Sequence, residues 1–161
     1  MEKKSGLFWL WLSGLVFVLD QWTKNTASSS LELYVPNKMT EFFNLTLMHN
    51  KGVAFSLLAE QSGWQRYFLS VVAILIVIWL LYWLFKNRYS QKLQNVALVL
   101  VIGGALGNVY DRIVFGYVVD FIELHYQGYY WPAFNLADSA ICLGAFLLII
   151  DAFKNKESGK D

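Results

Sequence analysis

The stretch YFLSVVAILIVIWLLYWLF, residues Tyr67–Phe85, is nineteen residues long and carries no charged side chain. In an α-helix, which rises about 1.5 Å per residue, it is long enough to cross a hydrocarbon core of about 30 Å. This stretch therefore predicts a transmembrane helix and places the chain among membrane proteins.

The composition of the whole chain agrees with that prediction. Of the 161 residues, 57% are hydrophobic and 16% are charged, whereas a soluble domain is roughly 45–50% apolar and about 25% charged. The net charge of +1 provides no basic field for nucleic acid. There is no HExxH pattern, and His49 lies far from His125, so no metal or other cofactor is predicted. The single cysteine, Cys142, is expected to be a small buried side chain.

Three further stretches are apolar enough to be membrane helices. The prediction is one integral membrane domain over residues 1–161, mainly α, with four transmembrane helices at about 7–24, 67–85, 94–112 and 136–153 and outer segments at 25–66 and 113–135. Eight of the thirteen Lys and Arg residues fall on one side of this topology: Lys3, Lys4, Lys86, Arg88, Lys92, Lys154, Lys156 and Lys160. Because basic loops stay in the cytoplasm, both termini are predicted to be cytoplasmic.

The first helix has an alternative interpretation as a cleavable signal peptide. Lys3 and Lys4 precede the apolar run, and the small residues 26–29 follow it. Asp20 and Lys24, however, are spaced i,i+4 and can pair on one helix face, which favours a retained helix.

The outer segments carry strand signals. Phe43, Leu45 and Leu47 alternate with polar or less buried positions, residues 31–35 alternate similarly, and residues 117–122 are β-branched and aromatic. We therefore expect a small β-sheet on the outer membrane surface, built from residues 31–49 and 117–124. Four glutamates are expected to face solvent: Glu32, Glu41, Glu60 and Glu123.

Four carboxylates lie at or near the ends of apolar stretches: Asp20, Asp111, Asp120 and Asp138. A charge at the bilayer centre costs about 2.5–3.5 kcal/mol on insertion scales, so such residues are functional candidates. In the predicted topology all four gather at the outer face. Gly103 and Gly107 form a GxxxG pattern, which predicts close helix packing.

The residues around these carboxylates resemble the signature blocks of the signal peptidase II family, the lipoprotein signal peptidases. The matching blocks are Asp20-Gln21 with Lys24, residues 50–55 (NKGVAF), residues 107–112 (GNVYDR), residues 116–121 (GYVVDF) and residues 134–138 (FNLAD). They follow one another in order over nearly the whole chain. One position departs from the family pattern, since His49 stands where the family usually has Arg.

The resemblance implies an aspartic endopeptidase of the bacterial cytoplasmic (inner) membrane that is sensitive to globomycin. Such enzymes cut prolipoproteins on the amino side of a cysteine that already carries diacylglycerol. Asp120 and Asp138 would be the catalytic pair, and Asn50 and Arg112 would hold the substrate. The implied supporting residues are Asp20, Lys24, Gly52, Asn108, Asp111, Asn135 and Ala137. Partners would be the lipidated prolipoproteins and membrane lipid, with the enzyme itself monomeric.

Two neighbouring carboxylates are chemically suited to this reaction, because they share one proton and can act together as acid and base. The alternative is a small transporter or channel in which the aspartates relay protons or bind cations. That alternative predicts carboxylates at several depths or near the membrane midplane, whereas here they are expected to gather at one face.

Overall fold

The structure is a computed structural model that describes residues 5–52 and 63–158. The helices are the 3₁₀-helix η1 (Gly6–Trp9), α1 (Leu10–Ser30), α2 (Trp64–Lys86), α3 (Lys92–Val114) and α4 (Leu136–Ser158). The strands are β1 (Asn37–Lys38), β2 (Phe43–Asn50), β3 (Val118–Tyr126) and β4 (Tyr129–Tyr130). The fold is therefore mainly helical with a small sheet, as the sequence predicts.

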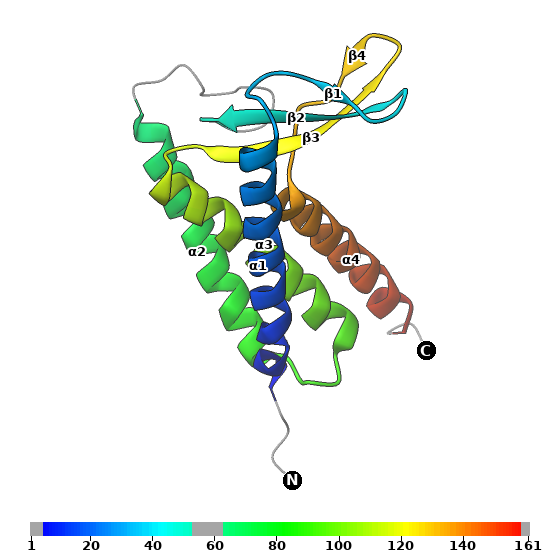
Figure 1. Cartoon of the computed structure of the whole chain (residues 1–161). Helices are drawn as coiled ribbons and strands as arrows, with labels where there is room; N and C mark the ends of the chain where they lie inside the picture. Colours follow the sequence, from blue (N-terminus) through cyan, green and yellow to red (C-terminus); the bar gives the residue numbers. More distant parts are fainter. Residues whose placement is uncertain (1–4, 53–62, 159–161) are drawn as a thin grey trace.

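Helix α3 is the centre of the molecule, because it packs on α1, α2 and α4 (Figure 1). Its buried side chains, among them Leu98, Val99 and Ile102, form one core with residues of α2. Glycines allow its closest approaches: a Cβ at Gly103 would overlap the carbonyl of Ser13 on α1, and one at Gly104 would overlap the carbonyl of Ala137 on α4. The predicted role of the glycine pattern in close packing is thus confirmed at α3.

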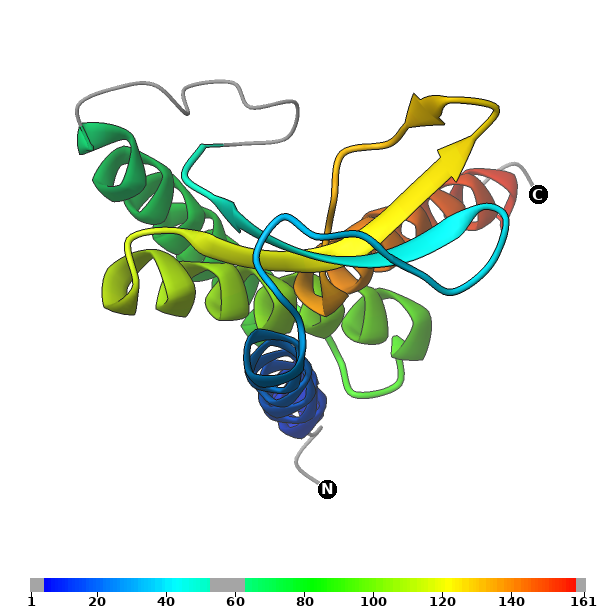
Figure 2. The same ribbon diagram turned by 45° about the horizontal axis from the view of Figure 1, so that its top comes forward.

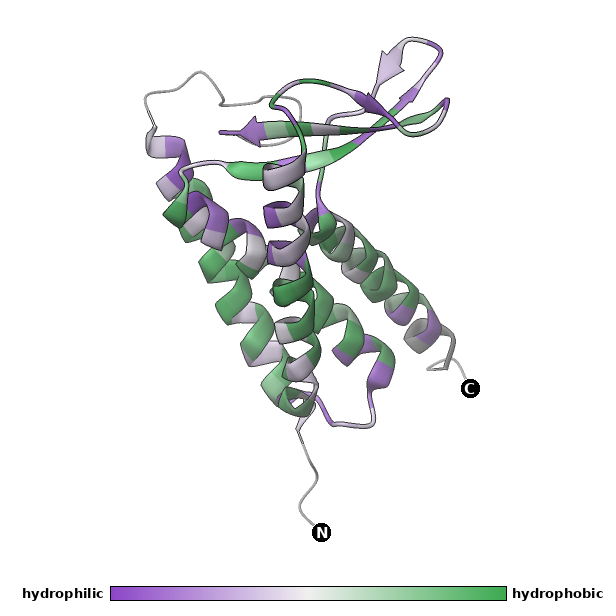
Figure 3. Ribbon diagram, in the orientation of Figure 1, coloured by the Kyte–Doolittle hydropathy of each residue, from purple (hydrophilic) through white to green (hydrophobic). Residues whose placement is uncertain are grey.

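Among the described helices, α2, α3 and α4 as far as Lys154 are long and apolar enough to cross a membrane. Val71, Leu75 and Ile78 of α2 are each more than half exposed, and Figure 3 shows hydrophobic residues along most of α2 and α4. Helix α1 has 21 residues, but its second half is polar, so it is less apolar than these three helices and is not counted with them. Three of the four predicted spans are therefore confirmed as helices of membrane length.

The four strands form one antiparallel sheet in the order β1-β2-β3-β4. The sheet lies across one end of the helices, and η1 and the α2–α3 connection lie at the other end (Figures 1 and 2). One sheet face packs Leu47, Val119 and Phe121 against Ala27 near the end of α1. The other face, which carries Asp120, looks toward the start of α4.

Two predicted boundaries are wrong. The predicted first helix ends at about residue 24, but helix α1 continues through residues 25–30, because Ala27 is buried against the sheet and keeps that last turn packed. Residues 31–35 form no strand beyond an isolated parallel bridge from Leu33 to Leu47. The backbone of Tyr34 has a φ of 63°, which breaks the extended path.

The alternation predicted for β2 is interrupted at a β-bulge. Leu45 pairs with Ile122, but Met48 rather than Leu47 pairs with Asp120, so two residues of β2 oppose Phe121 alone. The two bulge residues, Thr46 and Leu47, are consecutive and both buried. Beyond the bulge the faces of β2 are exchanged, as expected for one inserted residue.

The expectation for the glutamates holds only in part. Glu32 and Glu41 are exposed, and Glu60 lies outside the described residues. Glu123 is buried, with 6% of its surface exposed, because the side chains of Asn44 and Thr46 on β2 cover its carboxylate.

Candidate active site

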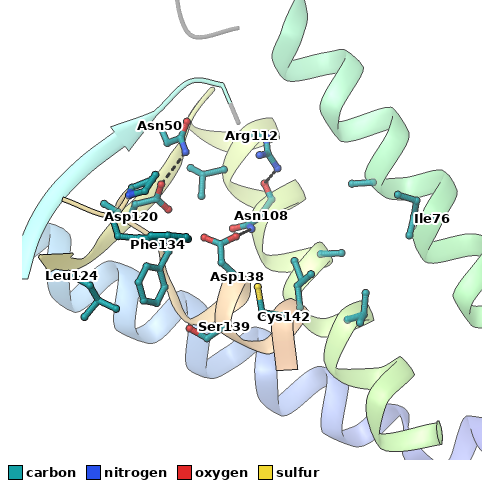
Figure 4. Close-up of a pocket in the computed structure, with 18 residues that line it drawn as sticks. Asn50, Ile76, Asn108, Arg112, Asp120, Leu124, Phe134, Asp138, Ser139 and Cys142 are labelled. Carbon is teal, nitrogen blue, oxygen red and sulfur yellow. Dashed lines mark hydrogen bonds between the residues drawn. The ribbon is translucent and has the colours of Figure 1, made fainter. Parts of the chain in front are cut away.

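Asp120 lies on β3 with only 2% of its surface exposed. Its Oδ1 accepts a hydrogen bond from Asn135 Nδ2 at 2.7 Å, and its Oδ2 accepts one from Asn50 Nδ2 at 3.0 Å. Figure 4 shows the carboxylates of Asp120 and Asp138 directed toward the same space. Strand β3 and helix α4 thus bring together two residues that are eighteen positions apart in the sequence.

Asp138 lies in the first turn of α4 and forms a capping box with Asn135. The Asp138 N–H donates to Asn135 Oδ1 at 2.9 Å, and the Asn135 N–H donates to Asp138 Oδ2 at 3.2 Å. Asn108 of α3 donates from Nδ2 to Asp138 Oδ1 at 2.7 Å. Both oxygens of Asp138 therefore have fixed donors, and the N-terminus of α4 favours a negative charge here.

The three asparagines that donate to the carboxylates are fixed in orientation. Each has its own carbonyl oxygen held by an N–H donor, so that the amide nitrogen must point toward an aspartate. The donors are Gly52 N to Asn50 (3.0 Å), Lys24 Nζ to Asn108 (2.9 Å) and Asp138 N to Asn135 (2.9 Å). The carboxylates consequently face amide groups whose rotation is already restricted.

A buried ion cluster lies behind these amides. Lys24 Nζ pairs with Asp20 Oδ2 at 2.8 Å and with Asp111 Oδ2 at 2.9 Å. Asp20 also accepts the Ala137 N–H at 2.9 Å, which caps the first turn of α4 from α1. The i,i+4 pair predicted within α1 is confirmed. It extends to α3 as a cluster with one cation and two anions.

Gln21 completes this cluster and was not predicted as a site residue. Its Nε2 donates to Asp111 Oδ1 at 2.9 Å and lies 3.2 Å from Asp20 Oδ2. The available signals were its place beside Asp20 in an apolar stretch and its inclusion in the matching block Asp20-Gln21. A Cβ at Gly107 would overlap Asp20 Oδ2, so glycine is required where the cluster meets α3.

The cluster also holds the backbone of β3 beside the catalytic candidate. The Val119 N–H donates to Asp111 Oδ2 at 3.1 Å, and the Val119 carbonyl accepts from Asn135 Nδ2 at 3.2 Å. Because Val119 precedes Asp120, helices α3 and α4 fix the position of Asp120 through its neighbour.

Burial is the main cause that raises the pKa of Asp120, and the negative charge of Asp138 is the second. The hydrogen bonds from Asn50 and Asn135 lower the pKa, and the balance is a value of about 7. Such a carboxyl group is poised to hold or release a proton near neutral pH. Arg112 lies on the same side of α3 as Asn108, and its Nη1 donates a hydrogen bond to the backbone carbonyl of Asn108 at 3.4 Å. Its guanidinium lines the same cavity as the two aspartates.

The cavity in front of the aspartates has a volume of about 790 Å³. Asn50, Asn108, Arg112, Asp120 and Asp138 form its polar part. The remaining lining is apolar and comes mostly from α2, α3, α4 and the segment before α4: Ala73, Ile76, Val101, Ala105, Val118, Leu124, Trp131, Pro132, Ala133, Phe134, Ile141 and Cys142, with Ser139. A polar end and a long apolar wall suit a substrate that is partly lipid.

Two expectations about single residues need correction or completion. Cys142 is exposed rather than buried, and it faces the cavity one turn beyond Asp138. His49 stacks on Tyr117 with ring centroids 3.9 Å apart, on the sheet face opposite Asp120. Burial, with the charge of Lys51, lowers the pKa of His49, which favours the neutral form of its ring.

The structure brings all the predicted site residues into one region, and their individual roles stay predictions. Residues 53–55 of the second signature block lie outside the described residues. Within the described part of the chain, no group of three or more His, Cys, Asp or Glu side chains could hold a metal ion.

Comparison with known proteins places this arrangement in a family. The profile of the signal peptidase (SPase) II family matches residues 12–154. The lipoprotein signal peptidase of Pseudoalteromonas atlantica is 52% identical over 156 residues, covering 97% of this chain and 95% of that protein. The lipoprotein signal peptidase of Alteromonas mediterranea is 50% identical over 153 residues, covering 95% and 84%.

Solved structures agree with these sequence matches. A bacterial membrane enzyme determined by the in meso method at 2.3 Å resolution superposes with a TM-score of 0.86 at 34% identity, covering 100% of this chain and 96% of that one. A second such structure, at 1.9 Å resolution, gives a TM-score of 0.82 at 34% identity, with coverages of 96% and 98%. The fold and the site thus define an integral membrane enzyme. The chain belongs to the signal peptidase II family.

Proposed function

We propose that this chain is an aspartic endopeptidase of the bacterial inner membrane that removes signal peptides from prolipoproteins. The observation that carries the aspartic mechanism is the placement of Asp120 and Asp138 on one cavity, with the Asn135 side chain and backbone bonded to both. The family match and the relatives named lipoprotein signal peptidase support the substrate.

Asp138 is proposed as the general base. It lies at the N-terminus of α4, accepts two N–H donors and shares the cavity with the Arg112 guanidinium, all of which stabilise its ionised form. Asp120 lies on a strand, and its raised pKa favours the protonated form at rest. The pair therefore begins the cycle with the shared proton on Asp120.

In the proposed reaction Asp138 takes a proton from a water molecule, whose oxygen attacks the scissile carbonyl carbon. Asp120 gives its proton to the carbonyl oxygen, which forms a neutral tetrahedral intermediate. On collapse, Asp138 returns the proton to the leaving nitrogen, and the carbon–nitrogen bond breaks. One hydroxyl proton of the intermediate returns to Asp120, which restores the starting state.

The cavity is proposed to hold the substrate backbone at its polar end. Arg112 presents a fixed set of N–H donors to peptide carbonyls, and Asn50 lies on the opposite wall (Figure 4). The apolar wall along α2 and α4 is proposed to accept the signal helix and the diacylglyceryl chains. Cleavage on the amino side of the modified cysteine is what the family resemblance implies. The site needs no second subunit, which supports a monomer.

The proposed topology has four spans, with α1 as the fourth, in a single domain. The α2–α3 connection, which contains Arg88, and the helix ends that carry Lys92 and Lys154 lie away from the sheet (Figure 1), which supports cytoplasmic termini and an active site at the outer face. Cysteine labelling in a Cys142→Ser background tests this arrangement. Ser90→Cys should react only after permeabilisation, and Gln127→Cys should react in intact cells. The reverse pattern would invert the topology.

Turnover of a lipidated prolipoprotein by purified protein tests the function. Asp120→Asn and Asp138→Asn should each lower kcat by about 10²–10⁴-fold or more, with wild-type thermal melting as the check on folding. Because the two groups act as a unit, the double variant should be about as inactive as either single variant. Near-normal turnover by either single variant would remove that aspartate from the pair.

A further inference from the structure

Among the described residues, the mechanism leaves one buried carboxylate without a task, that of Glu123. Its Oε2 accepts hydrogen bonds from Asn44 Nδ2 and from Thr46 Oγ1, both at 2.9 Å. None of the ion pairs within residues 5–52 and 63–158 involves it. A buried carboxylate that has only neutral donors carries a desolvation cost, so its presence asks for a reason.

The two donors lie at the β-bulge of β2. Asn44 is the direct partner of Glu123 across the sheet, and Thr46 is the first of the two residues that oppose Phe121. Glu123 therefore reaches along its own strand and ties Asn44, which comes one residue before the last regular pair of β2, to the first bulge residue, Thr46. The second bulge residue is held from the other side, because the Tyr34 N–H donates to the Leu47 carbonyl at 2.9 Å.

The bulge decides which face of β2 carries Asn50. After the bulge Met48 pairs with Asp120 and Asn50 with Val118, so Asn50 shares the face of Asp120 and bonds to it. If the pairing of Leu45 with Ile122 continued without a bulge, Leu47 would oppose Asp120 and Asn50 would oppose Tyr117. The Asn50 side chain would then point away from the cavity, and His49 would take its face.

We infer that Glu123 is a positioning residue for catalysis, which holds the β2 bulge in place and so keeps Asn50 directed at Asp120. It does not touch the cavity and acts only through the register of β2. This role rests on the proposed function of Asn50 and Asp120. It explains why a carboxylate is kept on the buried face of a strand, where an apolar residue would pack at lower cost.

The register can be measured without any turnover. Val119 and His49 are direct partners, and the Val119 N–H and carbonyl are bonded to Asp111 and Asn135 rather than to β2. The pair is thus of the non-hydrogen-bonded kind, with Cα atoms about 4.5 Å apart, which a disulfide can bridge. Without the bulge, Met48 would replace His49 as the partner of Val119.

The experiment compares disulfide formation in His49→Cys/Val119→Cys and in Met48→Cys/Val119→Cys, both in a Cys142→Ser background. With Glu123 present, the first pair should cross-link and the second should not. Adding Glu123→Leu should lower the yield of the first pair and raise that of the second. Glu123→Gln, whose Oε1 still accepts from both donors, should keep the original pattern, and so should Glu32→Leu at an exposed glutamate.

Kinetics with native Cys142 form the second arm. Glu123→Leu should lower kcat/KM by about 10²-fold, the scale expected for a displaced active-site group, and Glu123→Gln should restore it. Asn50→Ala should cost far less in the Glu123→Leu background than in the wild type, because Asn50 is already misdirected there. If Glu123 only supports the fold, Glu123→Leu should lower the melting temperature, but Asn50→Ala should lower kcat/KM by the same factor with and without Glu123→Leu.

The outcomes separate the possibilities. An unchanged cross-link pattern in Glu123→Leu, or an undiminished Asn50→Ala effect, overturns the inference. If Glu123→Leu does not fold, Thr46→Val removes one bulge hydrogen bond with little change in shape and should shift both readouts in the same direction. A wild type without turnover would defeat the proposed function, while the cross-links would still decide the register.

Discussion

Lys24 and Asp138 lie on opposite sides of a single amide group, that of Asn108. The Lys24 ammonium donates to Asn108 Oδ1 at 2.9 Å, and Asn108 Nδ2 donates to Asp138 Oδ1 at 2.7 Å. The positive charge therefore orients and polarises the amide toward the carboxylate. Lys24 thus acts on the Asp138 carboxylate through this amide, without contacting it.

Asn108→Asp should separate these two contacts. The new carboxylate would still pair with Lys24, but it would present an acceptor, not a donor, to Asp138. We expect kcat to fall by about 10²-fold because the base is displaced and repelled, while the protein remains folded. Asn25→Asp, the same substitution at an exposed position of α1, should leave kcat unchanged. Equal turnover in both variants would show that Asn108 does not act on Asp138.

The raised pKa of Asp120 should make stability depend on pH. In the folded protein this group keeps its proton up to a pKa of about 7, whereas its ordinary value is 3.8. Between about pH 3.8 and about pH 7 the folded state binds one more proton at this group than the unfolded state does. The contribution of Asp120 to the free energy of unfolding is therefore complete below about pH 3.8 and is lost as the pH rises through about 7.

Melting curves of the wild type and of Asp120→Asn between about pH 4.5 and 8 test this dependence. The wild type should lose stability relative to the variant over that interval, because groups common to both proteins cancel in the difference. Parallel curves would mean that Asp120 is already ionised at the low end of the range.

Asp20→Ala should lower stability more than it lowers the turnover of molecules that stay folded. The change removes a partner of Lys24 and the cap of the Ala137 N–H. Breaking a buried ion pair typically costs about 3–5 kcal/mol, and thermal unfolding in detergent measures the loss. Glu41→Ala, which breaks an exposed pair with Lys38, is the control and should not change the melting temperature. Full thermal stability without turnover would instead make Asp20 part of the chemistry.

Inhibition should follow the aspartic mechanism. Globomycin, whose hydroxyl would lie between Asp120 and Asp138 in place of the attacking water, should compete with the prolipoprotein substrate. EDTA should leave turnover unchanged. Activity that is lost with EDTA and restored by zinc would overturn the mechanism, and inhibition that does not depend on substrate concentration would argue against binding at the dyad.

The helices that cross or approach the membrane could be predicted because their signal is local. A charge-free run such as residues 67–85 leaves few alternatives to a buried or lipid-facing helix, and it predicts helix α2. The similarly apolar residues 136–153 predict helix α4. The four carboxylates Asp20, Asp111, Asp120 and Asp138 could be singled out because they lie at or near the ends of apolar stretches. The other site residues could be named through the resemblance of the surrounding blocks to the signal peptidase II family.

What the sequence did not reveal depends on partners that are distant along the chain. The last turn of α1 is stable because Ala27 packs on β3, and no local pattern announces that contact. The burial of Glu123 depends on Asn44 and Thr46, which are nearly eighty residues away. A bulge adds one residue to one strand and leaves the hydrophobic alternation before it intact, so periodicity alone could not locate the change of face.

The capping box at the start of α4 gives the enzyme a built-in reporter of its chemical state. In the proposed cycle Asp138 gains a proton as water attacks, and the acceptor of the Asn135 N–H then loses its negative charge. The backbone amide of Asn135 should therefore shift its NMR resonance when an intermediate mimic is bound, even though it touches no substrate. In the proposed cycle, catalysis and the capping of a helix share one carboxylate, so each turnover should weaken and restore the hydrogen bond from the Asn135 N–H at the start of α4.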